Sequence, residues 1–255
     1  LLSRGMRVVL YEAEPRLGGH SNTEQLPGPH GPVPVDTGFI VYNERNYPNL
    51  VALFAALGVA TDASDMSFAA SLGGGQLEFL VEDHLLPMGA AIWSTTARLM
   101  RDYPLHAFVR FFHSHGLLSL TDRPQWRTVR GGSREYVTRL QAGISEGVRS
   151  GSGVARVERA GALLRVTDRH GAADHFTDVV IATHADQALG MLAEPSAPVR
   201  STLSAFRYTE NLAVLHGDPT LMPRRRRVWS SWNYIGEPAA GRPDDPTLCV
   251  TYWMN

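Results

Sequence analysis

The sequence predicts an α/β fold in which a Rossmann-like dinucleotide-binding unit is interleaved with helical and β-rich segments. Three observations support this prediction. A short apolar, β-branched run at residues 6–11 ends at an acidic residue, as a buried parallel strand of such a unit does. The middle of the chain has apolar residues at helical spacing, and from Val154 onward the spacing changes to two.

Composition and charge exclude several classes of protein. The 255 residues are 44% hydrophobic and carry a formal net charge of −1, so they can bury a sizeable core and give no reason to expect nucleic acid as a partner. No apolar run is long enough to predict a transmembrane segment. Cys249 is the one cysteine, which excludes a disulfide and a cysteine-based metal site and makes the cytoplasm the expected location.

Glycine and proline residues mark the expected ends of the helices and strands in the first half of the chain. The expected elements, in order, are a helix end at residues 1–5, a strand at 6–11, an irregular stretch from 27 to 34, an extended segment from 33 to 42 and a helix from 47 to 57. Gly5 and Gly58 are placed to end the two helices. Residues 82–120 predict a few packed helices with breaks at Pro87, Gly89 and Pro104.

The second half begins with a helix and continues mainly as strands. Ser133, after the pair Gly131-Gly132, is the expected N-cap of that helix. The elements expected after it are strands at 154–158 and 163–167, a turn at 170–171, a buried strand at 178–183, a helix at 186–192, and strands at 211–216, 228–234 and 248–253.

Glu12 is the candidate ligand of a nucleotide ribose. A carboxylate at the end of a strand can accept hydrogen bonds from ribose hydroxyls when a glycine-rich turn lies nearby, here Gly18-Gly19. Many strands end in glutamate for no functional reason, so the spacing to the glycines gives this candidate its weight. The same carboxylate would serve a nicotinamide-dependent dehydrogenase, which stays open as an alternative.

The segment from Glu12 to Gly19, with its Glu-Ala, Arg and Gly-Gly, resembles the second fingerprint of the flavin-containing amine oxidase superfamily. Val35 to Val41 resembles the family's next conserved piece, in which the backbone passes close to the flavin ring. Gly153-Val154 resembles the strand that meets the adenine, and Asp178 to Thr183 resembles the strand that returns to the FAD domain. Their shared order covers most of the chain, and it is similar to that of a bacterial subgroup of predicted NAD/FAD-binding proteins.

This resemblance implies a fold, a cofactor and the residues that hold it. The fold is an incomplete Rossmann-like FAD-binding domain with an interleaved helical and β substrate domain. FAD is the implied cofactor, and its implied contacts are Glu12, Arg16, Gly18, Gly19, His20, Ser21, Gly38, Phe39, Ile40 and Val154. The expected FAD-binding parts are residues 1–60 and 131–192, and the expected substrate-domain parts are the mainly helical residues 61–130 and the β-rich residues 193–255.

Compared with the family, parts of the domain are expected to be missing. The first strand and its Gly-x-Gly-x-x-Gly loop would precede Leu1, and a glycine-rich segment that contacts the flavin would follow Asn255. The family also carries a longer helical insertion between the positions of Gly73 and Glu82. The chain is therefore expected to be truncated at both ends and shortened internally.

The implied activity is transfer of a hydride from a substrate carbon to FAD, for which the flavin supplies the redox chemistry. Amine oxidases often place a lysine near the flavin, on a strand expected near residues 211–216, and this sequence contains no lysine. That absence weakens an amine as the substrate and leaves a carbon–carbon bond of a lipid or polyene open. A non-catalytic or fragmentary member that binds no FAD is a further alternative. The sequence assigns neither a catalytic residue nor an oligomeric state.

Other conspicuous residues favour a structural interpretation. Asp36-Thr37-Gly38 matches the catalytic motif of aspartic proteases, but the second copy that those enzymes need is absent. His106, His113 and His115 have no suitably spaced carboxylate for a metal site, and Arg224–Arg227 is expected to be a solvated turn. Aromatic residues that alternate along strands favour a core over a flavin-facing pocket. They are Trp229, Trp232, Tyr234 and Trp253.

Overall fold

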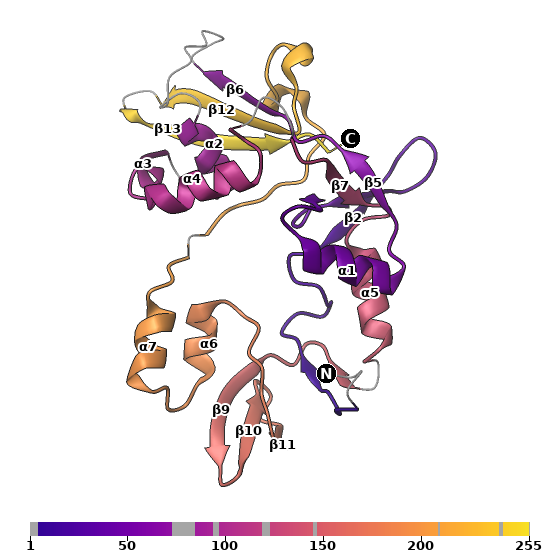
Figure 1. The fold of residues 1–255 in the computed structure, drawn as a ribbon, viewed down its shortest axis with the longest axis vertical. Helices are drawn as coiled ribbons and strands as arrows, with labels where there is room; N and C mark the ends of the chain where they lie inside the picture. Colours follow the sequence, from indigo (N-terminus) through magenta and orange to yellow (C-terminus); the bar gives the residue numbers. More distant parts are fainter. Residues whose placement is uncertain are drawn as a thin grey trace. The chain divides into compact units, whose positions relative to one another are not determined.

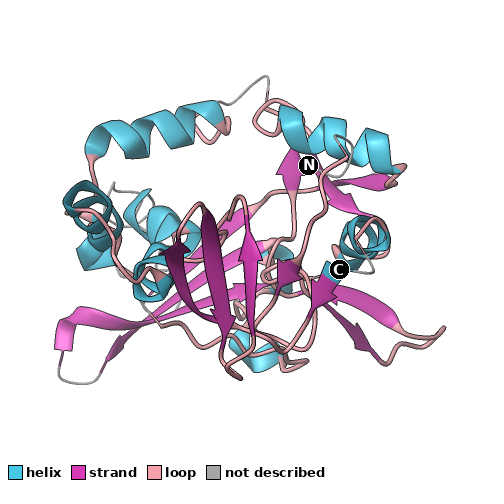
Figure 2. Cartoon of the chain, turned by 90° about the horizontal axis from the view of Figure 1, so that it is seen from below, coloured by secondary structure: helices cyan, strands magenta, loops and turns pink. Residues whose placement is uncertain are grey.

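The computed structural model describes residues 5–72, 85–93, 97–118, 123–144, 147–208, 210–239 and 242–254. The chain forms two compact units, each built from two separate stretches of sequence. Unit 1 comprises Leu1–Asn22 and Arg134–Glu210, and unit 2 comprises Thr23–Ser133 and Asn211–Asn255. Both units contain helices and strands, as the predicted mixed fold requires. Figure 2 shows the helices in cyan and the strands in magenta.

Unit 1 begins with the predicted parallel strand, although that strand is short. β1 (Leu10–Tyr11) pairs in parallel with β8 (Val148–Arg149). The expectation that residues 6–11 are buried is wrong, because Met6 is 41% exposed and Leu10 is 37% exposed. Among the described strands β8 is the one neighbour of β1.

The predicted meander follows in unit 1 (Figure 1). β9 (Val154–Ala160), β10 (Leu163–Asp168) and β11 (Ala173–Phe176) form an antiparallel sheet in the order β11-β10-β9. The turn between β10 and β11 contains Gly171, whose φ of +87° strains any residue with a β-carbon. The buried face includes Val166, which is 3% exposed. The period-two pattern therefore predicted this sheet correctly.

Three α-helices lie in the part of unit 1 that the structure describes. α5 (Arg134–Ala142) directly follows Ser133, the position predicted to begin it. α6 (Ala185–Met191) confirms the helix expected near residues 186–192 and contacts both β9 and α7 (Ala197–Ser204). No pattern in the sequence had indicated α7.

Two segments predicted as strands have no regular structure. Residues 178–183 and 211–216 are irregular, and their side chains include Val180 at 79% exposed and Leu212 at 92% exposed. An extended segment becomes a strand when its N–H and C=O groups pair with those of a neighbour. Within the described ranges no strand pairs with either segment, so both strand predictions are wrong.

Unit 2 contains three small sheets in the part of the chain that the structure describes. Their strand orders are β13-β12-β6, β2-β3 and β4-β7-β5, and the one parallel pair among them is β12 with β6. The strands are β2 (Thr23–Leu26), β3 (Val33–Asp36), β4 (Tyr42–Asn43), β5 (Thr61–Ser64), β6 (Phe68–Leu72), β7 (Trp126–Val129), β12 (Trp232–Ala239) and β13 (Arg242–Tyr252). The strands expected at 228–234 and 248–253 thus correspond in part to β12 and β13.

α1 (Pro48–Leu57) confirms the helix predicted in the first half. Proline is tolerated at its first position, where the missing N–H would have no helical partner. Gly58 ends it in the left-handed conformation at φ +66°, and its N–H donates to the Ala55 carbonyl. Phe54 on this helix is 3% exposed and lies with its ring edge-on to Tyr42, at 5.3 Å between centroids.

α2 (Leu85–Ile92), α3 (Ala97–Met100) and α4 (Leu105–Ser114) lie on one side of the β13-β12-β6 sheet (Figure 1), and α2 contacts β12. Pro104 precedes α4, as the predicted break requires. The breaks expected at Pro87 and Gly89 are wrong, because both residues lie within α2. Pro87 falls in the first helical turn, which has no intrahelical N–H bond to lose.

Some predictions fall on residues outside the described ranges. They are the helix end at residues 1–4 and the shortened insertion between Gly73 and Glu82. Over the residues that are described, no helix is both long enough and apolar enough to cross a membrane.

Candidate functional site

The residues implied to hold FAD fall in both units. Unit 1 contains Glu12, Arg16, Gly18, Gly19, His20, Ser21 and Val154, and unit 2 contains Gly38, Phe39 and Ile40.

In unit 1 the chain after β1 lies beside the start of β9. The Ser152 N–H donates a 2.9 Å hydrogen bond to the Glu12 carbonyl oxygen. A β-carbon at Gly153 would stand 3.1 Å from the β-carbon of Ala13, so glycine permits the close approach of the two backbones. The structure therefore brings together Glu12 and Val154, the two residues implied to contact the adenosine half of the cofactor.

One of the two oxygens of the Glu12 carboxylate is hydrogen-bonded to the backbone of the turn that follows it. One oxygen, Oε1, accepts a 2.9 Å hydrogen bond from the Glu14 N–H. Over the described residues no hydrogen bond or ion pair occupies the other oxygen of this partly exposed side chain. The carboxylate is thus oriented by the turn and can still accept hydrogen bonds from ribose hydroxyls.

The glycine pair forms a tight turn that carries positive charge. Gly18 and Gly19 adopt φ angles of +112° and +53°, and the Ser21 N–H donates to the Gly18 carbonyl at 2.8 Å. A β-carbon at Gly18 would stand 2.8 Å from the Ser21 carbonyl oxygen. This oxygen belongs to the backbone and cannot move aside as the end of a flexible side chain can. The exposed Arg16 guanidinium folds over the turn and donates to the Gly19 carbonyl at 3.0 Å. The turn can therefore present backbone and a cation to a phosphate.

α5 supports this turn from within unit 1. The hydroxyls of Ser21 and Tyr136 are hydrogen-bonded at 2.5 Å, and Val137 would lie 3.1 Å from a β-carbon on Gly18. Tyr136 is buried, at 8% exposed. The helix therefore fixes the turn on its inner side and leaves its outer side to solvent.

His20 belongs to a group of aromatic rings that sequence reasoning missed. Its ring lies 6.1 Å from that of His184, and His184 stacks on Tyr208 at 4.3 Å and 7° between planes. The Tyr208 hydroxyl accepts a 2.9 Å hydrogen bond from the Ala185 N–H. Because the three rings are far apart in sequence, no local spacing could have identified the group.

A second hydrogen-bonded network ties β1 to β8 and β11. The Tyr11 hydroxyl donates to Asp174 at 2.6 Å and accepts from Arg149 at 2.8 Å, and Arg149 is also ion-paired with Asp174. Burial, followed by the bond to Asp174, raises the pKa of Tyr11 to about 12. The bonds from Tyr11 and Arg149 lower the pKa of Asp174. These side chains hold the strand that ends at Glu12.

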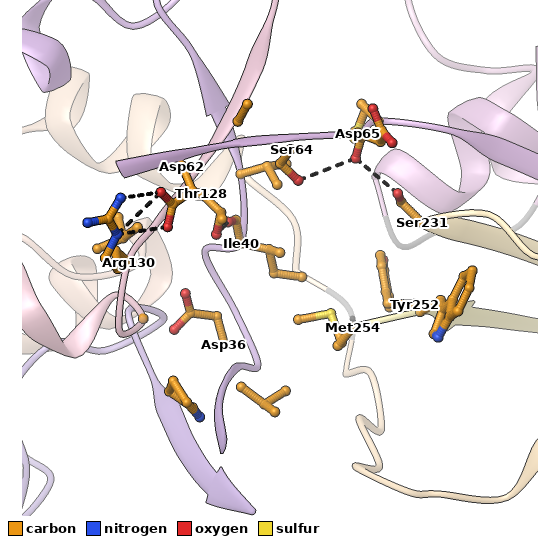
Figure 3. A pocket seen from close by; sticks show the side chains of 18 of the residues that line it. Asp36, Ile40, Asp62, Ser64, Asp65, Thr128, Arg130, Ser231, Tyr252 and Met254 are labelled. Carbon is orange, nitrogen blue, oxygen red and sulfur yellow. Dashed lines mark hydrogen bonds and ion pairs between the residues drawn. The ribbon is translucent and has the colours of Figure 1, made fainter. Parts of the chain in front are cut away.

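Unit 2 contains a cavity of about 520 Å³ (Figure 3), a size typical of small-molecule sites. Ile40, one of the implied cofactor residues, lines it, as do the glycines of Gly131-Gly132. Its other lining residues include Asp36, Asp62, Asp65, Thr128, Arg130, Ser231, Trp232, Tyr252, Trp253 and Met254. The walls thus combine three carboxylates, one cation and several aromatic rings.

Asp36 is the buried polar centre beside this cavity. It accepts hydrogen bonds from the Thr23 hydroxyl at 2.6 Å, from the Ser133 hydroxyl at 2.8 Å, and from the Ser133 N–H at 2.8 and 3.0 Å. Gly132, at φ +88°, lies so close that a β-carbon there would stand 2.4 Å from the Thr23 methyl group. The Asp-Thr-Gly segment is thereby joined to the Gly-Gly-Ser segment. The sequence marked the segment that contains Asp36 only by its resemblance to the family, and it assigned Asp36 itself no role.

The implied flavin-facing residues Gly38, Phe39 and Ile40 begin two positions after Asp36. The Thr128 hydroxyl donates to the Ile40 carbonyl at 3.0 Å and so attaches this segment to β7. The Phe39 ring lies edge-on to Tyr47 at 6.4 Å. Gly38 is exposed, whereas Phe39 and Ile40 are half-buried.

The remaining candidates divide between cavity and core. Trp232 and Trp253 line the cavity, whereas Tyr234 is buried at 2% exposed. The His115 ring stacks on Phe111 at 3.9 Å, and burial lowers the pKa of His115. No group of three or more potential metal ligands occurs over the described residues.

The architecture is that of the FAD-dependent amine oxidases. Residues 1–116 match the family model described as flavin containing amine oxidoreductase, which confirms the resemblance of the Glu12–Gly19 segment over that part of the chain. A search of curated protein sequences finds no match.

Several solved structures share the fold. Cyclohexylamine oxidase from Brevibacterium oxydans matches with a TM-score of 0.55 and 18% identity, over 80% of this chain and 58% of that one. Putrescine oxidase bound to putrescine matches with a TM-score of 0.53 and 13% identity, over 80% of this chain and 59% of that one. A fatty acid isomerase from P. acnes matches with a TM-score of 0.50 and 13% identity, over 77% of this chain and 57% of that one. The chain therefore spans less than two thirds of the length of the structures it resembles.

Proposed function

We propose that this protein is an FAD-dependent oxidoreductase that transfers a hydride from a substrate carbon, in an amine or in a carbon–carbon bond of a lipid or polyene, to the flavin. The observation that carries the proposal is the close approach in unit 1 of Glu12 and Ala13 to the start of β9 before Val154, with the Gly18-Gly19 turn a few residues after Glu12. The amine oxidase fold supports it.

The residues of unit 1 fit the adenosine and phosphate half of FAD. Glu12 would accept from the ribose hydroxyls through its unengaged oxygen, and Val154 would meet the adenine across the narrow approach that Gly153 permits. Arg16 would place its exposed charge by the pyrophosphate, against a turn that has no β-carbon in the way. His20 and Ser21 extend the same face of the turn.

Unit 2 fits the reacting half of the molecule. Gly38, Phe39 and Ile40 would face the flavin ring, and the neighbouring cavity would take a small-molecule or lipid-like substrate. When bound, the flavin supplies the hydride acceptor. The chain would orient the substrate against Trp232 and Tyr252, whose rings pack edge-on at 5.4 Å between centroids, and exclude water from it. Residues 1–60 and 131–192 would be the cofactor-binding parts, and residues 61–130 and 193–255 the substrate-binding parts. The proposed location is the cytoplasm.

The test is the visible absorbance of the purified protein, with added FAD, before and after Glu12→Gln. Loss of the carboxylate charge weakens binding of FAD roughly 10- to 100-fold, because hydrogen bonds to a charged group are worth about 1.5–3 kcal/mol. Glu14→Gln is the matched control, since only the N–H of Glu14 contacts Glu12, and its FAD affinity stays at the parent value. A colourless parent protein that takes up no added FAD contradicts the proposal.

A nicotinamide-dependent dehydrogenase is the second candidate, because the free oxygen of Glu12 would suit either dinucleotide. The two are separated by mixing substrate with the FAD-loaded protein in the absence of nicotinamide. Bleaching of the flavin absorbance supports the flavin oxidoreductase and excludes the nicotinamide enzyme.

A further inference from the structure

The four consecutive arginines Arg224–Arg227 concentrate positive charge on a chain whose formal net charge is −1. All four side chains are exposed, and none forms an ion pair with a described residue. The sequence contains no acidic residue from Pro219 to Ile235. This charge is therefore not neutralised by its own stretch of chain and is free to attract an anionic partner.

The arginine segment is held by aromatic contacts and is not a loose turn. The Trp229 indole N–H donates a 2.7 Å hydrogen bond to the Pro223 carbonyl, which closes the segment into a loop. The Arg226 guanidinium lies 5.5 Å from the centre of the Trp229 ring. Trp229 in turn packs edge-on against Trp253, at 5.5 Å and 84°. The loop thereby rests on the end of β13.

Further bonds fix the base of this loop. The Thr251 hydroxyl of β13 donates to the Leu221 carbonyl at 2.9 Å, and the Trp253 N–H donates to the Ser231 carbonyl at 3.0 Å. Met222 is buried beneath the loop, at 8% exposed. A loop anchored at both ends presents its outward side chains with little loss of conformational entropy on binding.

Large apolar side chains are exposed next to the arginines in the sequence and at Trp253, which packs on Trp229. Leu221 is 44% exposed, Val228 is 45% exposed and Trp253 is 39% exposed. Arginines attract phosphate groups, but exposed leucine and valine gain nothing from a purely polar polyanion. Aliphatic side chains and tryptophan beside basic residues are the composition of surfaces that lie at the headgroup boundary of a bilayer. We call Leu221, Arg224–Arg227, Val228 and Trp253 the basic–apolar surface.

We propose that the basic–apolar surface binds the face of a bilayer that contains anionic phospholipids. The arginines contact lipid phosphates, and Leu221, Val228 and Trp253 enter the boundary between headgroups and acyl chains. The segment crosses no membrane and acts as a peripheral contact. Trp253 and Ser231 also line the cavity of unit 2, so the bound face adjoins that cavity. This inference is independent of the proposed redox function.

The test is co-sedimentation of the 255-residue protein with vesicles of phosphatidylcholine alone or of phosphatidylcholine with phosphatidylglycerol. Binding is expected to the anionic vesicles at about 0.01 M ionic strength and to be strongly weakened at about 1 M, where the Debye length falls from about 30 to about 3 Å. The double substitution Arg224→Gln with Arg225→Gln lowers the partition coefficient roughly 10- to 30-fold, at about fivefold for each arginine. Val228→Ser lowers it severalfold without changing the charge.

The matched control removes two arginines elsewhere. Arg159 and Arg200 are exposed residues of unit 1, and the pair Arg159→Gln with Arg200→Gln leaves vesicle binding at the parent value. An equal loss in this control would show that net charge alone acts and would overturn the proposal. Circular dichroism of each variant confirms that the fold is intact.

Three further results would overturn it. The first is absence of binding to anionic vesicles at low ionic strength. The second is displacement from vesicles by inorganic phosphate at constant ionic strength, which would identify a site for an isolated anion. The third is binding to double-stranded DNA as strong as to vesicles and unaffected by Val228→Ser, which would identify a general polyanion surface. Quenching of tryptophan fluorescence by brominated phospholipid, reduced by Trp253→Phe, would support insertion of Trp253.

Discussion

Asp36 and Asp62 both line the cavity of unit 2, and their carboxylates have opposite environments. Asp36 is 7% exposed and accepts bonds from Thr23 and Ser133, all of them buried. The side chain of Asp62 is 47% exposed and pairs with Arg130, whose guanidinium approaches to 2.6 Å. Figure 3 shows Arg130 and Asp62 joined to each other at one side of the cavity.

The difference between Asp36 and Asp62 shows that the number of hydrogen-bond partners does not determine how much a polar contact contributes to the free energy of unfolding. When a buried carboxylate loses its hydrogen-bond donors, water cannot replace them. The same holds for buried donors that lose the carboxylate. An exposed ion pair exchanges its partner for solvent at little cost, because water screens the attraction. Asp36 therefore holds the Asp-Thr-Gly segment against the Gly-Gly-Ser segment. Asp62 contributes a negative charge, paired with Arg130, at the edge of the cavity.

Asp36→Ala is expected to have the largest effect. It leaves the Thr23 and Ser133 hydroxyls and the Ser133 N–H buried without their acceptor, which lowers the free energy of unfolding by roughly 3–5 kcal/mol. Urea unfolding measures the change, and Asp36→Asn, which keeps one acceptor oxygen, loses less. If Asp36→Ala lowers the free energy of unfolding no more than Asp62→Asn does, the buried and the exposed carboxylate contribute equally and the proposed difference between them is wrong.

Gly132→Ala tests the same buried centre from its backbone. Gly132 has a φ of +88° and no room for a β-carbon beside Thr23, so alanine adds backbone strain and a clash. We expect a loss of about 2 kcal/mol in the free energy of unfolding. Gly19→Ala is the control, since its φ is +53° but nothing lies within 4 Å of a β-carbon there. Equal losses in the two variants would show that the contact with Thr23 contributes nothing.

Tyr11→Phe tests the network of Tyr11, Arg149 and Asp174, whose side chains are less buried than Asp36 and in part shielded from solvent. Removal of the hydroxyl ends the bonds to Asp174 and Arg149 and lowers the free energy of unfolding by about 1 kcal/mol at neutral pH. In the folded state the pKa of Tyr11 is raised from 10.0 to about 12. Its contribution is therefore complete below pH 10 and is lost as the pH rises through about 12.

The pKa of Asp174 is lowered from 3.8, so its contribution is present above that value and is lost as the pH falls through the lowered pKa. The difference in stability between the parent and Tyr11→Phe thus narrows in both strong acid and strong alkali. Urea midpoints across this pH range measure it. A difference that stays constant with pH would mean that the hydroxyl is not part of the titrating network.

Asp62→Asn is expected to have the smallest effect. The hydrogen bond from Arg130 lowers the pKa of Asp62, but the exposed pair is screened by solvent. We expect no measurable change in the urea midpoint at physiological ionic strength and a slight decrease at low salt. A loss at high salt comparable to that of Asp36→Asn would show that Asp62 supports the fold as a buried group does.

Local sequence signals predicted the elements whose stability is local. α1 follows from apolar spacing and from Gly58, and the β9–β11 meander follows from alternation and from the turn at Gly171. The segments 178–183 and 211–216 have the same apolar, β-branched composition but no strand partner over the described residues. Composition specifies a preference for an extended backbone, and only a neighbour converts it to a strand.

The candidate site shows the same limit. Glu12, Arg16 and Gly18 lie within a few residues of one another, so their order could be recognised by its resemblance to the family's fingerprint. Asp36 and Ser133 are 97 positions apart, and nothing in either segment specifies the other. The first segment was noted for its resemblance and the second as the start of a helix, but the bond that joins them could not be predicted from the sequence.

The parallel pairing of β1 with β8 also bears on the order in which the chain folds. Tyr11 and Arg149 are 138 positions apart, so their contact must close one of the longest loops in the chain. Thr23 and Ser133, at the ends of the intervening stretch, lie with their hydroxyls 3.3 Å apart. Once that stretch has folded, its ends are already together and the remaining loop is much shorter, which reduces the entropic cost of closure by about 1 kcal/mol. Formation of the Thr23–Ser133 contact before that of Tyr11 with Arg149 would thus speed the joining of the two stretches of unit 1.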